Sequence, residues 1–353
     1  MSRNGCRWHP TSNGMKKEIK KFLTFRASSI GDALMGKYFL ENVHAYAPEA
    51  KGFMLVGGRG GMVRDLFHAY PWITVIEANR KSVESLELAW LKLRGCDLTL
   101  TQEAERPFSL PSKIFARLVT KRGGLYGFND KWFGNRFIYD RIVPFEGERK
   151  SDGIIVEERK ALTLAGIPIA SQEFSLKYEN DPHVFKRFNV EPRSYILMHL
   201  FAGSPGREIS QKRRIEIASA VHSAYPNTIL LTGGKGTERE RTDVASLGLP
   251  RVRSIAGDTS MKEFINLIAN AEVVVSLNTG AGHIASHLKV PTVIISPQGV
   301  EGAWFGESMY GNRPKILSNK DVDDSAPRDS VHPPSMDMVT DEEIISAIKG
   351  FMK

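Results

Sequence analysis

The chain has 353 residues, of which 25% are charged and 41% are hydrophobic, and its formal net charge is +8 at pH 7. These proportions are ordinary for a globular protein and exclude disordered and fibrous classes. No apolar run approaches the roughly 18 residues of a membrane-spanning helix, and the N-terminus has no apolar signal-peptide core. We therefore expect a cytoplasmic protein, and at about 150 residues for each domain the length predicts two domains.

Residues 1–14 are polar and contain glycine and proline, which predicts a flexible tail, with Met15 as an alternative start. From residue 15 to 185 apolar runs alternate with helical periodicity, which predicts an α/β domain with a doubly wound parallel sheet. The predicted strands are 19–25, 53–56, 73–77 and 98–101, and the predicted helices are 32–46, 62–69, 82–93 and 151–165. Residues 109–180 are otherwise irregular, and we expect ligand-facing structure there.

A second alternation begins at Tyr195 and predicts a second Rossmann-like domain over residues 190–335. The boundary is expected in the proline-containing segment 180–193. The predicted strands are 195–200, 228–231 and 253–255, the predicted helices are 212–225, 238–247 and 261–271, and a strand–loop–helix–strand unit follows at 273–296. Thr340 and the acidic residues after it predict a capping box and a final helix over residues 340–353. The economical arrangement is two such domains facing one cleft.

The loop of the unit at residues 273–296 predicts a phosphate-bearing ligand. Asn278 and Thr279 precede Gly280 and Gly282, and the next helix carries His283 on its first turn. We expect the two glycines to let the backbone approach a ligand, while the free N–H groups and the helix dipole face the same space.

A second corner follows the first predicted strand. Ser28, Ser29, Gly31 and Asp32 place two hydroxyls, a glycine and a carboxylate at the carboxyl end of that strand, where open α/β sheets bind ligands. The helix dipole favours the ionised form of Asp32, as a general base requires. The alternative is that Asp32 or one of the serines only caps the helix.

Charge and cysteines restrict the partners further. The positive net charge favours an anionic partner such as a nucleotide sugar, an anionic glycolipid or a membrane surface, unless it only keeps the protein soluble. Nucleic acid is not expected, because neither a basic base-reading helix nor an aromatic RNA-binding signature occurs in the sequence. Cys6 and Cys96 lack the number and spacing of a disulfide framework or a zinc site, so we expect reduced thiols.

The segment 25–32 resembles the opening signature of glycosyltransferase family 9, the ADP-heptose:lipopolysaccharide heptosyltransferases. Residues 255–260 and 278–285 resemble the nucleotide-sugar signature of that family, and residues 199–207 and 231–234 match it in order. The resemblance implies a GT-B fold and inverting sugar transfer from a nucleotide diphosphate sugar, with ADP-heptose as donor and a lipopolysaccharide-core or other glycan as acceptor. It implies no tightly bound cofactor and no required divalent metal. The resemblance also implies that the protein acts at the cytoplasmic face of the inner membrane, in peripheral contact with it.

The resemblance also implies roles for individual residues. Asp32 matches the proposed general base, and Ser28, Ser29 and Gly31 form the acceptor or phosphate loop beside it. The donor-binding residues that it implies are Ser204, Arg207, Glu238, Thr259, Asn278, Thr279, Gly280 and His283.

Two of these donor residues, Arg207 and Glu238, have specific expected roles, and a run of cations follows Arg207. Arg207 stands where the family usually has a lysine thought to neutralise the donor phosphates, which arginine can do with a bidentate fork. Glu238 matches a glutamate expected to hold the ribose, although Glu240 competes with it and a solvated helix-start glutamate is an equal alternative. We expect Lys212 to Arg214, cations at a helix start, to be solvated rather than bound to an anion.

The chain departs from the family at two places. Asn278 replaces a usual aspartate, which removes a negative charge beside the donor, so we expect a shifted donor preference. The tryptophan usual near Arg207 is absent, and an aromatic surface with it. Two alternatives stay open. One is a sugar-nucleotide epimerase or hydrolase, because GT-B folds also host those reactions, and the other is a nucleotide-sugar-binding protein without transfer activity.

Overall fold

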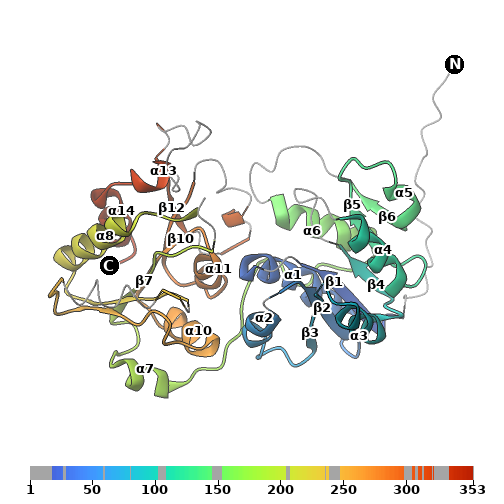
Figure 1. Cartoon of the computed structure of the whole chain (residues 1–353), viewed down its shortest axis with the longest axis horizontal. Coiled ribbons are helices and arrows are strands. Elements are labelled where there is room, and N and C mark those ends of the chain that lie inside the picture. The colour runs from blue at the N-terminus through green and yellow to red at the C-terminus, as the bar shows by residue number, and fades with distance from the viewer. Residues whose placement is uncertain are drawn as a thin grey trace.

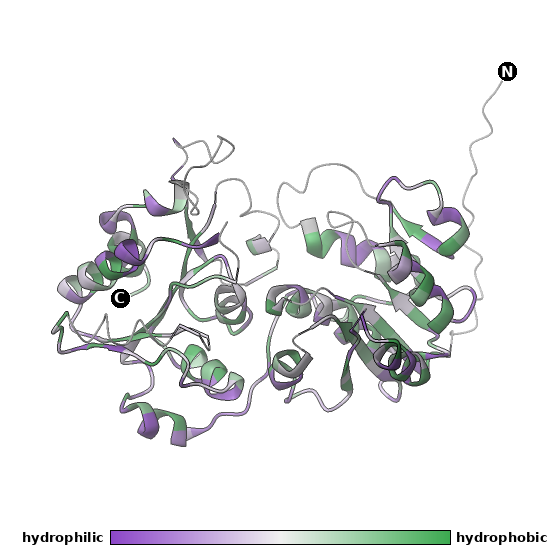
Figure 2. Cartoon of the chain, in the orientation of Figure 1, coloured by the Kyte–Doolittle hydropathy of each residue, from purple (hydrophilic) through white to green (hydrophobic). Residues whose placement is uncertain are grey.

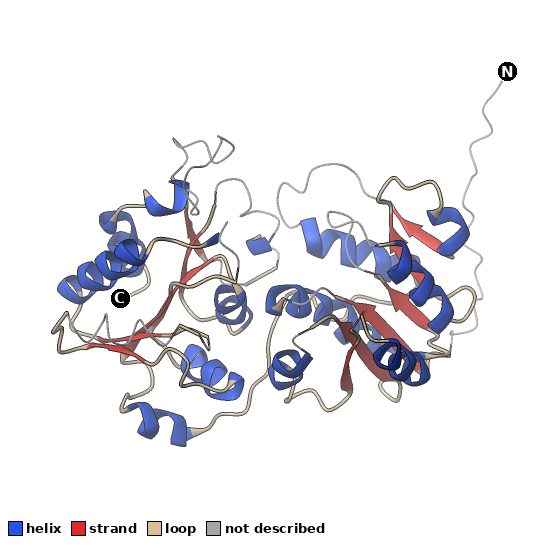
Figure 3. Ribbon diagram, viewed as in Figure 1, coloured by secondary structure: helices blue, strands red, loops and turns tan. Residues whose placement is uncertain are grey.

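The computed structural model describes residues 18–26, 29–58, 60–79, 81–101, 109–144, 153–203, 207–234, 236–237, 247–297, 304–306, 309–311, 314–319, 321 and 334–352. Two six-stranded sheets, in both of which every strand pairing is parallel, form the two halves of the molecule, and helices cover them (Figures 1 and 3). The expected doubly wound α/β architecture is therefore confirmed.

The N-terminal sheet has the strand order β3-β2-β1-β4-β5-β6. Its strands are β1 (Lys21–Phe25), β2 (Lys51–Val56), β3 (Ile73–Glu77), β4 (Leu98–Leu100), β5 (Leu125–Phe128) and β6 (Arg141–Val143). Its helices are α1 (Ile30–Tyr46), α2 (Gly60–Leu66), α3 (Val83–Leu93), α4 (Leu110–Val119), α5 (Asn135–Ile138) and α6 (Gly153–Leu164). The order reverses direction between β1 and β4, and ligands of such sheets bind at this switch point.

The C-terminal sheet has the order β12-β11-β10-β7-β8-β9. Read from β9, this is the same order as in the first sheet, with its switch point between β7 and β10. The strands are β7 (Tyr195–His199), β8 (Thr228–Leu231), β9 (Val252–Ser254), β10 (Val273–Leu277), β11 (Thr292–Ile295) and β12 (Lys315–Leu317). The helices are α7 (Pro182–Phe188), α8 (Gln211–Ala224), α10 (Met261–Ala269), α11 (Gly280–His287), α13 (Pro334–Asp337) and α14 (Asp341–Lys349). The predicted helix at 238–247 lies almost wholly outside the described residues.

The expectation of an irregular segment after residue 109 is wrong for residues 109–144. This segment holds α4, β5, α5 and β6. β5 has four residues and β6 has three, and these runs are too short to register as hydrophobic periodicity. None of the helices in the described part of the chain has the length and apolar character needed to cross a bilayer.

One hydrophobic cluster runs through both halves of the molecule. It includes Tyr38 and Phe39 of α1 together with Ile284 and Ala285 of α11, all essentially inaccessible to solvent. Hydrophobic residues are frequent on the strands of both sheets, and the helices carry both hydrophobic and hydrophilic residues (Figure 2). Because α1 and α11 pack on each other, the segments that follow β1 and β10 are held face to face.

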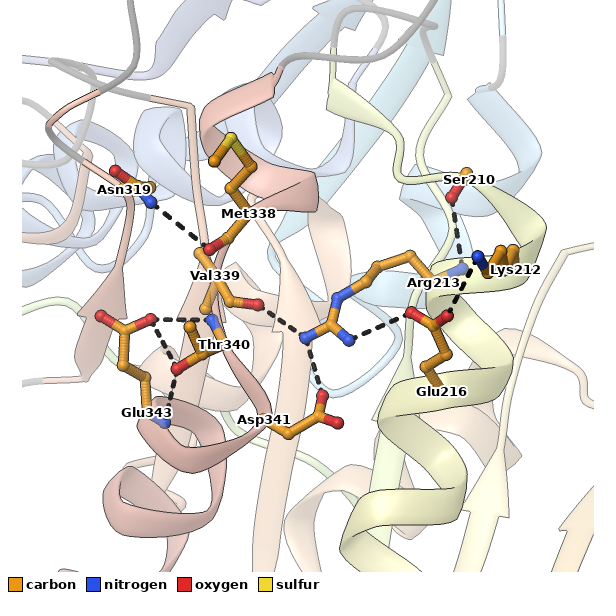
Figure 4. Close-up of polar contacts among 10 residues, drawn as sticks. All are labelled: Ser210, Lys212, Arg213, Glu216, Asn319, Met338, Val339, Thr340, Asp341 and Glu343. Atoms are coloured by element: carbon orange, nitrogen blue, oxygen red, sulfur yellow. Dashed lines mark hydrogen bonds and ion pairs between the residues drawn. The ribbon is translucent and has the colours of Figure 1, made fainter.

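The C-terminal helix is tied to the second domain by a buried cation. The Arg213 guanidinium donates to the Val339 carbonyl at 2.6 Å and pairs with Asp341 at 2.7 Å, and its side chain is only 11% exposed (Figure 4). Arg214, 13% exposed, donates to the Ile209 carbonyl and lies over the Phe201 ring. The expectation that these cations are solvated is therefore wrong for Arg213 and Arg214, because carbonyl and carboxylate acceptors surround them, and correct for Lys212, which is 87% exposed.

The capping box predicted at Thr340 is confirmed. The Thr340 hydroxyl accepts from the Glu343 N–H at 3.2 Å, and the Glu343 carboxylate accepts from the Thr340 N–H at 2.8 Å. This fixes the start of α14 beside Asp341, the partner of Arg213. The helix start and the ion pair therefore support each other (Figure 4).

Replacing Arg213 by alanine is expected to lower the free energy of unfolding by about 2 kcal/mol, because it removes charge-assisted bonds and leaves the Val339 carbonyl and Asp341 without them. Lys212→Ala is the matched control, one position away and exposed, and should change stability by less than about 0.5 kcal/mol. Denaturant titration of both variants checks this. Equal stabilities would show that Arg213 does not hold α14 in place.

Candidate functional site

A cavity of about 1000 Å³ lies between the carboxyl edges of the two sheets. Its N-terminal wall comes from the starts of α1 and α2, and its C-terminal wall from the segments after β7, β8 and β10 and from the start of α10. Both switch points therefore open on the same space. The volume is that of a pocket for a ligand larger than a typical metabolite.

Ser29 and Asp32 form a hydrogen-bonded pair at the start of α1. The Ser29 hydroxyl donates to the Asp32 carboxylate at 2.6 Å and accepts from the Asp32 N–H at 3.2 Å, so Ser29 is the N-cap of the helix. Ser29 and Gly31 line the cavity, whereas Asp32 is 2% exposed and lies behind them. The capping alternative is thus correct for Ser29, and the Asp32 carboxylate contacts a residue of the cavity wall. Ser28 lies outside the described residues.

A second carboxylate, Asp65 of α2, was not predicted as a site residue. It is exposed and lines the cavity on the same wall as Ser29. The pattern of α2 in the sequence gives it no motif, and only the packing of α2 beside α1 brings it to the cleft. Any assignment of the base must therefore separate Asp32 from Asp65.

Gly31 and Gly280 lie where the two domains meet, and a side chain at either position would collide with the other domain. A Cβ on Gly31 would lie 2.7 Å from Cδ2 of His283, and a Cβ on Gly280 would lie 2.9 Å from Cβ of Ile30. Gly282 packs against Leu277 and Ile294 of its own domain. Gly280 lines the cavity, and its missing side chain also admits Ile30. That Gly280 and Gly282 let the backbone approach a ligand stays a prediction.

His283 is a buried, neutral imidazole. It is 4% exposed and stacks on Phe305 with ring centroids 4.4 Å apart, and Trp304 meets it edge-on at 5.9 Å. Burial, assisted by the positive charge of Arg207, lowers the pKa of His283 to about 3. Burial likewise lowers the pKa of His199, which bonds the Thr232 hydroxyl, to about 4. At neutral pH both rings can hydrogen-bond a ligand but carry no charge.

The stability of the protein is expected to fall as the pH is lowered from about 6.5, the ordinary pKa of histidine. Above that pH the ring of His283 is neutral in both states. Below it the unfolded chain binds a proton that the folded chain refuses, so stability decreases until the pH reaches the folded-state pKa of about 3. At pH 5 this costs about 2 kcal/mol. Calorimetry at pH 7.5 and 5.0 should show a smaller loss for His283→Gln than for the unmodified protein, and an equal loss would contradict it.

Asn278 uses its amide within the fold. The side-chain N–H₂ of Asn278 donates to the Ser296 hydroxyl at 2.9 Å. Asn278 is only 3% exposed, but it still lines the cavity. An aspartate here could not make this donation. Thr279 is the N-cap of α11, and Thr279 and Thr259 also line the cavity.

The structure brings most of the predicted donor residues together. Arg207, Thr259, Asn278, Thr279, Gly280 and His283 all line the cavity. Ser204, Glu238 and Glu240 lie outside the described residues. The cavity also has aromatic walls from Phe201, Phe264 and Trp304, so the expected lack of an aromatic surface is wrong for the site as a whole.

The comparisons with known proteins agree with this geometry. Residues 162–299 match glycosyltransferase family 9 (heptosyltransferase). The lipopolysaccharide core heptosyltransferase OpsX of Haemophilus influenzae is 24% identical over 281 residues, 78% of each chain. Over residues 162–299 the chain is thus similar to glycosyltransferase family 9. Two solved folds are also similar. A family 9 glycosyl transferase from Veillonella parvula has a TM-score of 0.75 and 12% identity, with 96% of this chain and 99% of that chain covered.

The second similar structure is E. coli heptosyltransferase WaaC with ADP-2-deoxy-2-fluoro heptose, with a TM-score of 0.67, 15% identity, and 94% and 99% of the two chains covered. The fold is accordingly GT-B. At the two positions where the resemblance led us to expect a departure from the family, the Asn278 amide donates a hydrogen bond that an aspartate could not donate, and Arg207 lines the cavity. Groups of three or more His, Cys, Asp or Glu side chains able to hold a metal ion do not occur among the residues that the structure describes.

Proposed function

We propose that the chain is an inverting glycosyltransferase that moves heptose or a related sugar from a nucleotide diphosphate sugar, ADP-heptose in the first instance, to a lipopolysaccharide-core or similar glycan. The observation that carries this is the single cavity with Ser29 and Asp32 at one wall and Arg207 with the start of α11 at the other. In this proposal residues 15–185 bind the acceptor and residues 190–335 bind the donor. The family relation and the relative OpsX support the choice of sugar.

The C-terminal wall of the cavity, which binds the donor in this proposal, suits a diphosphate leaving group. Arg207 supplies a permanent positive charge, and the first turn of α11 supplies unpaired N–H groups and the positive end of a helix dipole. Asn278 adds no opposing charge. As the bond from the anomeric carbon to the diphosphate breaks, these groups stabilise the negative charge that develops on the diphosphate, and no metal is required for that step.

The N-terminal wall of the cavity, the acceptor wall in this proposal, supplies the general base. The acceptor hydroxyl attacks the anomeric carbon from the face opposite the diphosphate, and its proton passes to the Ser29 oxygen while the Ser29 proton passes to Asp32. The 2.6 Å bond between Ser29 and Asp32, with only Ser29 on the cavity wall, supports this route. One displacement assisted by one carboxylate inverts the anomeric centre without a covalent intermediate.

A panel of nucleoside diphosphates tests the donor part of the proposal. Adenosine diphosphate should raise Tm more than uridine, guanosine or cytidine diphosphate, since a ligand stabilises the folded state that binds it. Incubation with ADP-heptose then separates the reaction classes. Nucleotide release that needs no acceptor would indicate a hydrolase or epimerase, and tight binding without turnover on any acceptor would indicate a binding protein.

A further inference from the structure

One face of α4 is apolar but exposed. Leu110, Ile114 and Leu118 are 48%, 47% and 64% exposed and follow one another at intervals of four residues, so they form one stripe along the helix. The opposite face, with Ala116 and Val119, is fully buried. α4 therefore packs on the domain with one apolar face and presents a second one outward, which a helix with only water beside it does not need.

Exposed aromatic side chains continue this stripe. Phe133 and Phe137 are 74% and 72% exposed, and Trp132 is 36% exposed. The segment that carries them packs on α4, since the buried Lys113 ammonium lies over the Trp132 ring at 4.6 Å. α4, α5 and β6 lie together at the end of the molecule remote from the C-terminal domain (Figure 1).

Hydrogen bonds from the buried Lys113 fix the segment that carries Trp132 and Phe133. Lys113 donates to Asp130 at 2.6 Å and to Asn135 at 2.7 Å, on either side of Trp132 and Phe133. Although burial opposes ionisation, the bonds from Lys113, Asn135 and the Trp132 N–H lower the pKa of Asp130, so this carboxylate stays charged. The rings are thus displayed in a fixed arrangement, and docking does not have to order them.

Within residues 109–144 the exposed charges are all positive: Lys121, which pairs with Asp97, Arg122, Lys131, Arg136 and Arg141. The neighbouring helix α3 contacts α4 and adds exposed charges of both signs, Glu84 and Glu87 with Lys92 and Arg94. The two carboxylates of this segment, Asp130 and Asp140, are 7% and 20% exposed and are tied to Lys113 and Arg117. The surface therefore combines apolar side chains with cations and lacks exposed carboxylates of its own.

We propose that this surface, formed by the α4 stripe, Phe133, Phe137 and the five cations around them, docks on an anionic lipid bilayer. Apolar and aromatic side chains enter the headgroup layer while lysine and arginine contact lipid phosphates. A second copy of the same surface is a poor partner, because it would bring cations against cations.

The position of the surface gives the docking a use, and this part of the inference rests on the proposed function. The segment with Phe133 follows β5, and Ser29 follows β1, at the same carboxyl edge of the sheet. Only β4 lies between those strands, so their ends are about 10 Å apart. A lipid-anchored acceptor would then present its sugars next to the acceptor wall of the cavity.

Sedimentation of the full chain with vesicles tests the docking. Vesicles of phosphatidylcholine mixed with phosphatidylglycerol should bind the protein, and vesicles of phosphatidylcholine alone should bind it much more weakly. Phe133→Ser and Phe137→Ser should each weaken binding about tenfold or more. Lys131→Gln and Arg136→Gln should each weaken it about fivefold. The controls are Met338→Ser, 54% exposed in the C-terminal domain, and Lys212→Gln, 87% exposed, which should bind like the unmodified protein.

The outcomes separate docking from catalysis. Absence of binding, equal binding to both vesicle types, or equal losses in the controls and the surface variants would overturn the docking proposal. Transfer to a delipidated, water-soluble acceptor without vesicles should be unchanged in all the surface variants, whose Tm values also report correct folding. If soluble transfer is absent while vesicle binding behaves as expected, the proposed function fails and the docking surface stands.

Discussion

Replacement of Asp32 by asparagine is expected to lower kcat about a thousandfold while leaving the affinity for the nucleoside diphosphate unchanged, because general-base assistance contributes on the order of 10²–10⁴ in rate. Asparagine keeps the shape of the buried side chain but cannot take up a proton. Ser29→Ala is expected to lower kcat by a similar factor, because it removes the hydroxyl that relays the acceptor proton to Asp32 across a 2.6 Å hydrogen bond. Steady-state kinetics with both substrates measures these effects.

Asp65→Asn is the matched control for this experiment. Asp65 lines the same wall and is exposed, so its loss should leave folding intact and change kcat only slightly if Asp32 is the base. A large loss in Asp65→Asn together with an active Asp32→Asn would transfer the role of base to Asp65. Isothermal titration with the nucleoside diphosphate shows whether either change acts through binding.

Replacement of Arg207 by alanine is expected to weaken donor binding by about 10- to 100-fold, since hydrogen bonds to charged groups contribute about 1.5–3 kcal/mol. Arg207→Lys should restore part of the affinity, because it restores the charge but not the bidentate fork. Isothermal titration with the nucleoside diphosphate measures both. Full affinity in Arg207→Ala would remove Arg207 from the donor site.

The same variant has a second readout that is independent of the ligand. The charge of Arg207 assists burial in lowering the pKa of His283, so its removal should raise that pKa from about 3. A histidine titration followed by NMR on the free protein detects the change. An unchanged His283 pKa with reduced nucleotide affinity would mean that Arg207 acts on the ligand from further away than the structure places it.

The fold could be predicted because its signals are local. Strands β1 and β10 are short, largely apolar runs, and each is followed by a loop and a helical segment, so the alternation around them could be read along the chain. The two corners that line the cavity were predictable for the same reason. Ser29 to Asp32 and Asn278 to His283 are contiguous segments at the carboxyl ends of strands, where the topology of such sheets places ligands.

The features that could not be predicted depend on packing between distant segments. Asp65 and Trp304 reach the cavity only because their segments meet there, and nothing near them in the sequence carries a motif. Arg213 was expected in solvent because its acceptors, Val339 and Asp341, lie more than a hundred positions away. A solvated cation and a buried ion pair look identical when only neighbours in the chain are considered.

The glycine positions show the same limit. Gly31 and Gly280 were linked to ligand binding because each lies in a loop before a helix. In the structure each is also the point where one domain meets the other, at His283 and at Ile30. The sequence shows that a glycine has no side chain, but it does not show which group of the folded protein lies in the space that a side chain would fill.

Release of nucleoside diphosphate from ADP-heptose by the purified protein, measured with and without a heptose-deficient lipopolysaccharide core, tests the central claim most directly. The account predicts release that depends on the acceptor, equals the sugar transferred, inverts the anomeric centre, and nearly disappears in Asp32→Asn but not in Asp65→Asn. Release at the same rate without acceptor, or transfer with retention of the anomeric configuration, would contradict it.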